Sequence, residues 1–128
     1  AYCYNQFGLN KYKVYGDGEV PAGRHQVRVE FAYDGGGVGK GGTATLYVDG
    51  NKAGEGRIDA TVPMVFSADE TTDLGSDGGT PVSDDHEPGK TEFNGRVHWV
   101  QLDLGDDAED ADHLITPEER LRVAMSRQ

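Results

Sequence analysis

The sequence predicts an all-β protein, an antiparallel two-layer β-sandwich that ends in a short C-terminal helix. About seven or eight short segments rich in aromatic and β-branched residues follow one another, with no helical pattern between them. Nineteen glycines and five prolines beside 35% hydrophobic residues also favour many strands joined by turns. The length of 128 residues fits one domain over residues 1–128 that is large enough to bury a core.

The clearest strand is expected from His25 to Tyr33, where apolar and polar residues alternate. Val27, Val29 and Phe31 alternate with Gln26, Arg28 and Glu30. A period of two predicts that one face of this strand is buried and that the other faces water. The remaining strands are expected at residues 2–4, 12–15, 43–48, 52–58, 61–66 and 96–104.

Two of these strands carry further information. Asp49-Gly50-Asn51 predicts the tight turn of a hairpin between residues 43–48 and 52–58. In residues 96–104, Val97 and Trp99 are expected on one face and Val100 on the other. A strand that is apolar on both faces is typical of the middle of a sandwich or of a bulge.

The last part of the chain changes character. Residues 67–94 show little periodicity and many turn formers, which predicts a long acidic loop. Thr116-Pro117-Glu118-Glu119 then supplies an N-cap, a proline at the first helical position and a capping-box acid. We therefore expect a helix at about residues 116–126 that packs against the sheet or a neighbour.

The stretch DGGGVGKGGT at residues 34–43 has the composition of a phosphate-binding loop but not its pattern. The first Walker position would be Asp34, whose carboxylate repels phosphate, and the residue after Lys40 is Gly41 instead of Ser or Thr. A dinucleotide fingerprint also requires a helix after the loop, and residues 43–48 predict a strand. We expect a connection between two strands, with several glycines at positive φ.

The negative charge is concentrated in one segment. Residues 69–112 hold 14 Asp or Glu against Lys90 and Arg96, which gives a local charge of −12 within a net charge of −11. Such a segment repels phosphate backbones and anionic lipid headgroups, so nucleic-acid binding and membrane binding are not expected. Such a segment can bind cations or a basic partner surface. The alternative is a solvated acidic loop that binds neither.

Calcium is the cofactor for which the acidic loop holds suitable ligands. Compared with a twelve-residue calcium loop, Asp73, Asp77 and Asp84 fall on positions one, five and twelve, but Gly75 occupies position three and no helices flank the loop. The alternative is that these side chains cap turns through Asx-type hydrogen bonds. The loop acids Asp69 and Glu70, together with Lys40 and Trp99, are further candidates for a ligand-binding surface or an interface.

No catalytic motif is recognised in the sequence. The chain contains no Gly-x-Ser-x-Gly elbow, and its four histidines do not fall at metal-ligand spacing. The single cysteine, Cys3, cannot form an internal disulfide, and the sequence places beside it no base or helix N-terminus that would activate it as a nucleophile.

An ordered set of motifs resembles the C-terminal region of long bacterial arylsulfatases and spans nearly the whole chain. The motifs are Tyr4-Asn5 with Phe7-Gly8-Leu9, Phe31 to Gly37 with Gly39 to Gly42, Leu46 to Gly50, Phe66 to Thr71, Gly78 with Thr80 to Ser83, and Leu114 to Leu121. The resemblance implies an accessory β-sandwich from a bacterial enzyme that hydrolyses sulfate esters. In that family a large α/β domain holds a divalent cation and a formylglycine made within a Cys/Ser-x-Pro-x-Arg motif.

That motif is missing from this chain, because neither Cys3 nor any of the four serines begins it. No catalytic residue of the family is therefore carried over. We expect a soluble, non-catalytic domain in a compartment left open, which packs on a sulfatase catalytic domain and stabilises it or shapes the entrance of its active site.

The alternative is a lectin-like module that binds carbohydrate. In a jelly-roll, concanavalin A-like sandwich, exposed aromatic rings can stack on sugars. The candidates are Tyr12, Tyr15, Tyr47 and Trp99. The net negative charge of the chain disfavours a sulfated sugar as the ligand.

Overall fold

The computed structural model describes residues 1–63, 72–78, 81–86 and 90–105, which contain five β-strands and no helix. Among these residues no helix is long and apolar enough to cross a membrane. The all-β prediction is confirmed for the described part of the chain. The helix predicted at 116–126 lies outside it.

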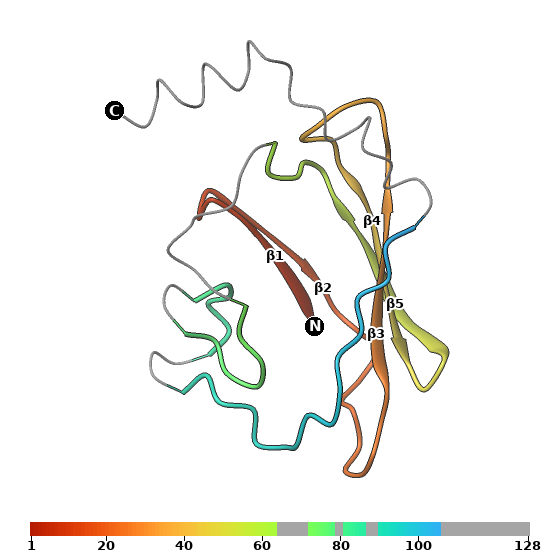
Figure 1. Ribbon diagram of the computed structural model, residues 1–128, viewed down its shortest axis with the longest axis vertical. Helices are drawn as coiled ribbons and strands as arrows, with labels where there is room; N and C mark the ends of the chain where they lie inside the picture. Colours follow the sequence, from red (N-terminus) through yellow and green to blue (C-terminus); the bar gives the residue numbers. More distant parts are fainter. Residues whose placement is uncertain (64–71, 79–80, 87–89, 106–128) are drawn as a thin grey trace.

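The strands form two antiparallel sheets that face each other in two layers (Figure 1). The smaller sheet is a ribbon of β1 (Tyr2–Gln6) and β2 (Asn10–Val14). The larger sheet has the order β3-β4-β5, and its strands are β3 (Val27–Tyr33), β4 (Gly42–Val48) and β5 (Asn51–Ile58). This arrangement is consistent with a β-sandwich, whereas five strands do not establish a jelly-roll.

The larger sheet has one apolar and one polar face, because directly paired residues of antiparallel strands project to the same side. Val29 pairs with Leu46, and Phe31 pairs with Ala44, so these side chains share the inner face. The outer face carries charged residues such as Arg28, next in sequence to Val29. The alternation predicted for β3 therefore assigns its apolar and polar side chains to the correct faces of the sheet.

The core lies where the ribbon covers β4 and β5. Its buried residues are Val14 from β2, Ala44 and Leu46 from β4, and Ile58 from β5. Gly56 allows β2 to approach closely, because a Cβ at this position would lie 2.8 Å from a methyl group of Val14. The absence of a side chain at Gly56 thus lets the backbones of the two layers lie close together.

The hairpin between β4 and β5 confirms the turn predicted from the sequence. Asp49 and Gly50 connect the strands, with φ angles of 51° and 81°. Two consecutive positive φ values are typical of a type I′ turn, whose twist matches that of the flanking strands. The Asp49 carboxylate fixes the turn, because Oδ1 accepts the Gln26 N–H at 2.9 Å and Oδ2 lies 2.7 Å from His25 Nδ1.

The glycine-rich stretch is a connection between β3 and β4, as predicted. Gly35, Gly36, Gly37 and Gly39 have φ angles between 72° and 110°, which disfavour other residues. The chain then enters the strand β4 and not a helix. The structure therefore lacks the helix N-terminus that a dinucleotide site of this type would need.

The prediction that one face of β3 is buried was wrong. Every residue of β3 is exposed, including Val27, Val29, Phe31 and Tyr33 on the inner face. The reason is the placement of the ribbon, because β2 packs mainly on β5 and, to a smaller extent, on β4. Sequence alternation identified the apolar face but not whether another layer covers it.

The prediction of a strand at residues 96–104 was also wrong. These residues are exposed and belong to no strand in the described part of the chain. A strand exists only when a neighbour supplies a ladder of hydrogen bonds, and local sequence preference cannot supply the neighbour. Residues 61–63, the described part of the strand expected at 61–66, are likewise outside any strand.

Candidate functional site

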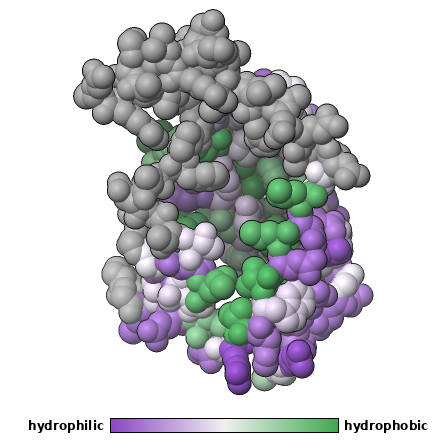
Figure 2. All heavy atoms as spheres, viewed as in Figure 1, coloured by the Kyte–Doolittle hydropathy of each residue, from purple (hydrophilic) through white to green (hydrophobic). Residues whose placement is uncertain are grey.

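The most prominent surface feature is the uncovered apolar face of β3. Val27, Val29, Phe31 and Tyr33 are between 39% and 60% exposed. Hydrophobic residues also reach the surface between polar ones in the space-filling view of Figure 2. Contiguous exposed apolar residues on a small domain mark a surface that contacts another molecule or domain.

A second surface, here called the groove, has both apolar and polar lining, lies between two loop segments and has a volume of about 440 Å³. It is lined by Leu74, Gly75, Phe93 and residues 95–100. The Phe93 N–H donates a hydrogen bond to the Gly75 carbonyl at 2.7 Å, which ties the two segments together.

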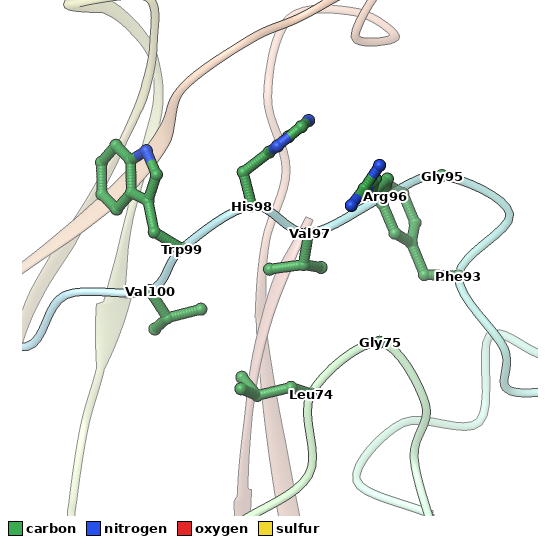
Figure 3. A pocket seen from close by; sticks show the side chains of 9 residues that line it. All are labelled: Leu74, Gly75, Phe93, Gly95, Arg96, Val97, His98, Trp99 and Val100. Carbon is green, nitrogen blue, oxygen red and sulfur yellow. The ribbon is translucent and has the colours of Figure 1, made fainter.

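Side chains of different character extend to the two sides of residues 96–100. Val97 and Val100 extend to the side on which Leu74 lies, while His98 and Trp99 extend to the other side (Figure 3). Val97 and Trp99 were expected on the same face, and this expectation fails because the segment does not have the alternation of a strand. Trp99 is 57% exposed, so its ring is accessible at the rim of the groove.

The acidic segment is held against the ribbon by lysines from β2. Lys13 Nζ lies 2.6 Å from a carboxylate oxygen of Asp84 and 2.6 Å from one of Asp85, and Lys11 Nζ lies 3.6 Å from Asp84. The hydrogen bond from Lys13 is the largest cause of the lowered pKa of Asp84, which is about 2. The same two carboxylates raise the pKa of Lys13. The ion pairs of Lys13 with Asp84 and Asp85, here called the lysine clamp, join residues that are 71 and 72 positions apart.

The three predicted calcium ligands do not come together. Asp73 Oδ2 accepts the Gly78 N–H at 2.8 Å, Asp77 Oδ2 accepts the Val82 N–H at 2.9 Å, and Asp84 binds the lysine clamp. Among the described residues, no group of three or more His, Cys, Asp or Glu could hold a metal ion. The first two contacts each join an Asp side chain to a backbone N–H five residues further on, so they hold the loop internally but span more residues than the Asx turn of the alternative. Calcium binding stays a prediction, which a fall in melting temperature on adding a chelator would support.

The other predicted site residues are dispersed. Lys40 forms no ion pair within the described part of the chain, and its N–H donates to the Tyr33 hydroxyl at 3.0 Å. Trp99 belongs to the groove, whereas Asp69 and Glu70 lie outside the described residues. The sequence thus placed Trp99 at a surface but did not indicate Leu74, which lines the same groove from another part of the chain.

The electrostatics of the glycine-rich connection agree with its rejection as a phosphate site. The guanidinium of Arg57 binds both carboxylate oxygens of Asp34, at 2.9 and 2.7 Å. This hydrogen bonding lowers the pKa of Asp34, so the carboxylate stays charged at the start of the connection. Arg57 is engaged by this carboxylate, and Asp34 would repel an incoming anion.

The geometry therefore offers an exposed apolar face on β3, a groove with mixed apolar and polar lining, and a salt-bridged acidic segment. Comparison with known proteins adds no identity to these features. No family model matches the chain, and no curated protein or solved structure was found to match it.

Proposed function

We propose that this chain is a non-catalytic β-sandwich domain of an arylsulfatase-like sulfuric ester hydrolase, which packs on a catalytic domain and stabilises or modulates it. The observation that carries the proposal is the exposed apolar face of β3. A sheet that is apolar on one side normally buries that side against another layer. In the described part of this chain the ribbon covers mainly the β4 and β5 portion.

The energetic argument concerns the four apolar side chains of β3. Full burial of a Val or Phe side chain contributes about 1.5–3 kcal/mol. These residues are 39–60% exposed, so a substantial part of that free energy remains to be gained on docking. The sulfatase assignment of the partner is supported by the ordered motifs of the sequence, such as Phe31 to Gly37 and Leu46 to Gly50.

The activity of the purified chain tests the non-catalytic role. We expect no hydrolysis of p-nitrophenyl sulfate, because the chain has no Cys/Ser-x-Pro-x-Arg motif from which a formylglycine could be made. Measurable turnover by this chain alone would contradict the proposal. Sequencing the reading frame upstream of Ala1 tests the parent enzyme, and a formylglycine motif in that frame is the expected result.

The docking face is tested in the longer protein encoded by that frame. Val29→Asp places a charge on the inner face of β3 and is expected to lower the melting temperature and the turnover of p-nitrophenyl sulfate. Ala32→Asp introduces the same side chain on the outer face of the same strand and serves as the matched control. Equal effects of the two variants would contradict docking through the inner face.

Sugar binding is a second candidate function, favoured by the exposed ring of Trp99 beside the groove. An aromatic ring can stack on the apolar face of a pyranose, and His98 projects to the same side of the segment as Trp99 (Figure 3). Trp99 is the sole tryptophan of the chain, so intrinsic tryptophan fluorescence reports on this site alone. Titration with galactose is expected to change this fluorescence if the lectin-like function is correct, and an unchanged signal would reject it.

A further inference from the structure

Among the described residues, no strand pairs with the edge of β3 that faces away from β4, and this free edge is distinct from the apolar face of the strand. β3 is the outer strand of the order β3-β4-β5, and it pairs with β4 over all seven residues without a bulge. It contains no proline, lysine or bulge, and the charges it carries, Arg28 and Glu30, are of opposite sign and so do not repel every antiparallel partner. All of its residues are exposed.

The hydrogen-bond phase shows which main-chain groups point to this edge. The Asp34 N–H donates to the Gly41 carbonyl at 3.0 Å, and the Asp49 N–H donates to the Gln26 carbonyl at 2.9 Å. Because such pairs occur at every second residue, the even-numbered residues of β3 bond to β4. The N–H and C=O groups of Val27, Val29, Phe31 and Tyr33 therefore point away from β4, and no backbone hydrogen bond to them is found within the described ranges.

We propose that β3 pairs with β3 of a second copy of this chain, antiparallel and with the two-fold axis at Val29. This pairing would join the two three-stranded sheets into one sheet of six strands. It places Val29 opposite Val29 of the second copy as a hydrogen-bonded pair, which is the phase that the free edge requires. The inference goes beyond the proposed function, because it uses the main-chain edge of β3 and not its apolar face.

Charge complementarity selects the second copy as the occupant. In this register Arg28 lies opposite Glu30 of the second copy, and Glu30 lies opposite Arg28 of the second copy. Both are non-hydrogen-bonded positions, where opposing side chains are closest. Within one copy, Arg28 Nη1 already lies 2.7 Å from Glu30 Oε1, and the Arg28 guanidinium stacks 4.3 Å from the centre of the Tyr47 ring. The four charges would alternate in sign around the axis.

Other registers do not give this match. A two-fold axis at Phe31 places Glu30 opposite Ala32 and Arg28 opposite Asp34, which lies beyond β3 and already binds Arg57. An axis at Val27 places Arg28 opposite Gln26 and Glu30 opposite Arg24, which lies before β3. Neither register gives both residues an opposite charge within the strand. Axes at Arg28 or Glu30 place like charges opposite each other. They also place residues whose main-chain groups already bond to β4 at the centre of the new pairing.

Sedimentation velocity of the purified full chain over a range of concentrations tests the association. The experiment is done at about 0.15 M salt, which screens the repulsion between two copies that each carry a net charge of −11. We expect a concentration-dependent species with twice the monomer mass of 13.8 kDa. A chain that remains monomeric at every concentration would overturn the proposal.

Charge reversal tests the register. Arg28→Glu and Glu30→Arg each place like charges opposite each other twice, and each is expected to raise the dissociation constant of the dimer about tenfold or more. The double variant Arg28→Glu/Glu30→Arg restores opposite charges and is expected to restore the dimer. A dimer that ignores the single reversals, or that the double variant fails to restore, would refute this interface.

Mixing the two single variants gives the sharpest readout. In a mixed dimer both charge pairs become opposite in sign again, so an equimolar mixture is expected to form heterodimers although each variant alone is monomeric. A mixture that stays monomeric would count against the proposal. Hydrogen exchange of the wild-type chain needs no variant: the amides of Val27, Val29, Phe31 and Tyr33 should gain protection as concentration rises, and unchanged exchange would also reject the pairing.

Discussion

At the scale of single residues, the polar contacts that hold loops in place join residues far apart in the sequence. Lys13 binds Asp84 and Asp85 across 71 and 72 positions, and His25 binds Asp49 across 24 positions. No local pattern specifies such pairs, because the same residue types occur many times in the chain. The sequence therefore located the acidic segment, while the identity of its basic partner came only from the structure.

Removing the lysine clamp should destabilise the fold in a pH-dependent way. Lys13→Met leaves Asp84 and Asp85 close together without their shared cation, so we expect a lower melting temperature at neutral pH. The pKa of Asp84 is about 2 in the folded protein, against an ordinary value of 3.8. The ion pair therefore stabilises the fold fully at pH values above 3.8, and this stabilisation is lost as the pH falls toward the folded-state pKa of about 2.

The difference in melting temperature between wild type and Lys13→Met, followed by circular dichroism, should therefore shrink as the solution is acidified over this interval. Lys40→Met is the matched control, since Lys40 has no ion pair in the part of the chain that the structure describes. A difference that is the same in acid and at neutral pH would contradict the ion-pair explanation.

The His25–Asp49 pair should respond in the opposite direction at higher pH. The hydrogen bond to Asp49 is the largest cause of the raised pKa of His25, whose ordinary value is 6.5. A raised histidine pKa stabilises the fold below the ordinary value, and this contribution is lost as pH rises through the folded pKa. We expect His25→Asn to lower the melting temperature at pH values below that range and to have little effect well above it. An effect of His25→Asn that is the same at every pH would contradict the role assigned to the pair.

At the scale of elements, the hairpin between β4 and β5 and the glycine-rich connection were predictable because their signals are local. The dipeptide Asp49-Gly50 specifies positive φ at both positions, whatever the rest of the chain does. The segment at 96–104 has an equally strong strand composition but forms no strand, because no described neighbour pairs with it. Turns are determined by the residues within them, whereas strands also require a partner.

Gly50→Ala tests the turn directly. Gly50 has a φ of 81°, so an alanine there is expected to cost about 1 kcal/mol of unfolding free energy. Gly18→Ala is the control, because a Cβ at Gly18 would meet no atom within 4 Å and its φ is not in the positive region. Urea denaturation measures both variants, and a similar cost for the two would contradict the role assigned to the turn.

At the scale of the whole molecule, the small core and the exposed β3 face have the same origin. The ribbon packs on β4 and β5, so apolar residues on one face of one sheet are divided into a buried and an uncovered group. Alternation in the sequence marks the face but carries no information on how far the opposite layer extends. The uncovered group, on β3, is the observation that supports docking of this face on another domain.

Two truncations on the same face should therefore differ. Ile58 is 1% exposed, and Ile58→Ala is expected to cost about 2–5 kcal/mol of unfolding free energy because it leaves a cavity in the core. Val29 is 41% exposed, and Val29→Ala should cost less than about 1 kcal/mol at low protein concentration. Urea denaturation of both variants checks this, and equal costs would show that β3 belongs to the core.

By itself, the sequence determined the all-β class, the hairpin at Asp49-Gly50, the glycine-rich connection and the concentration of negative charge, since each depends on residue type and local spacing. The tertiary structure alone decided that the ribbon leaves β3 uncovered, that Lys13 binds the acidic segment, and that residues 96–104 pair with no described strand. These outcomes depend on which segments meet in space, which is fixed by the packing of whole layers and not by the preferences of any one segment.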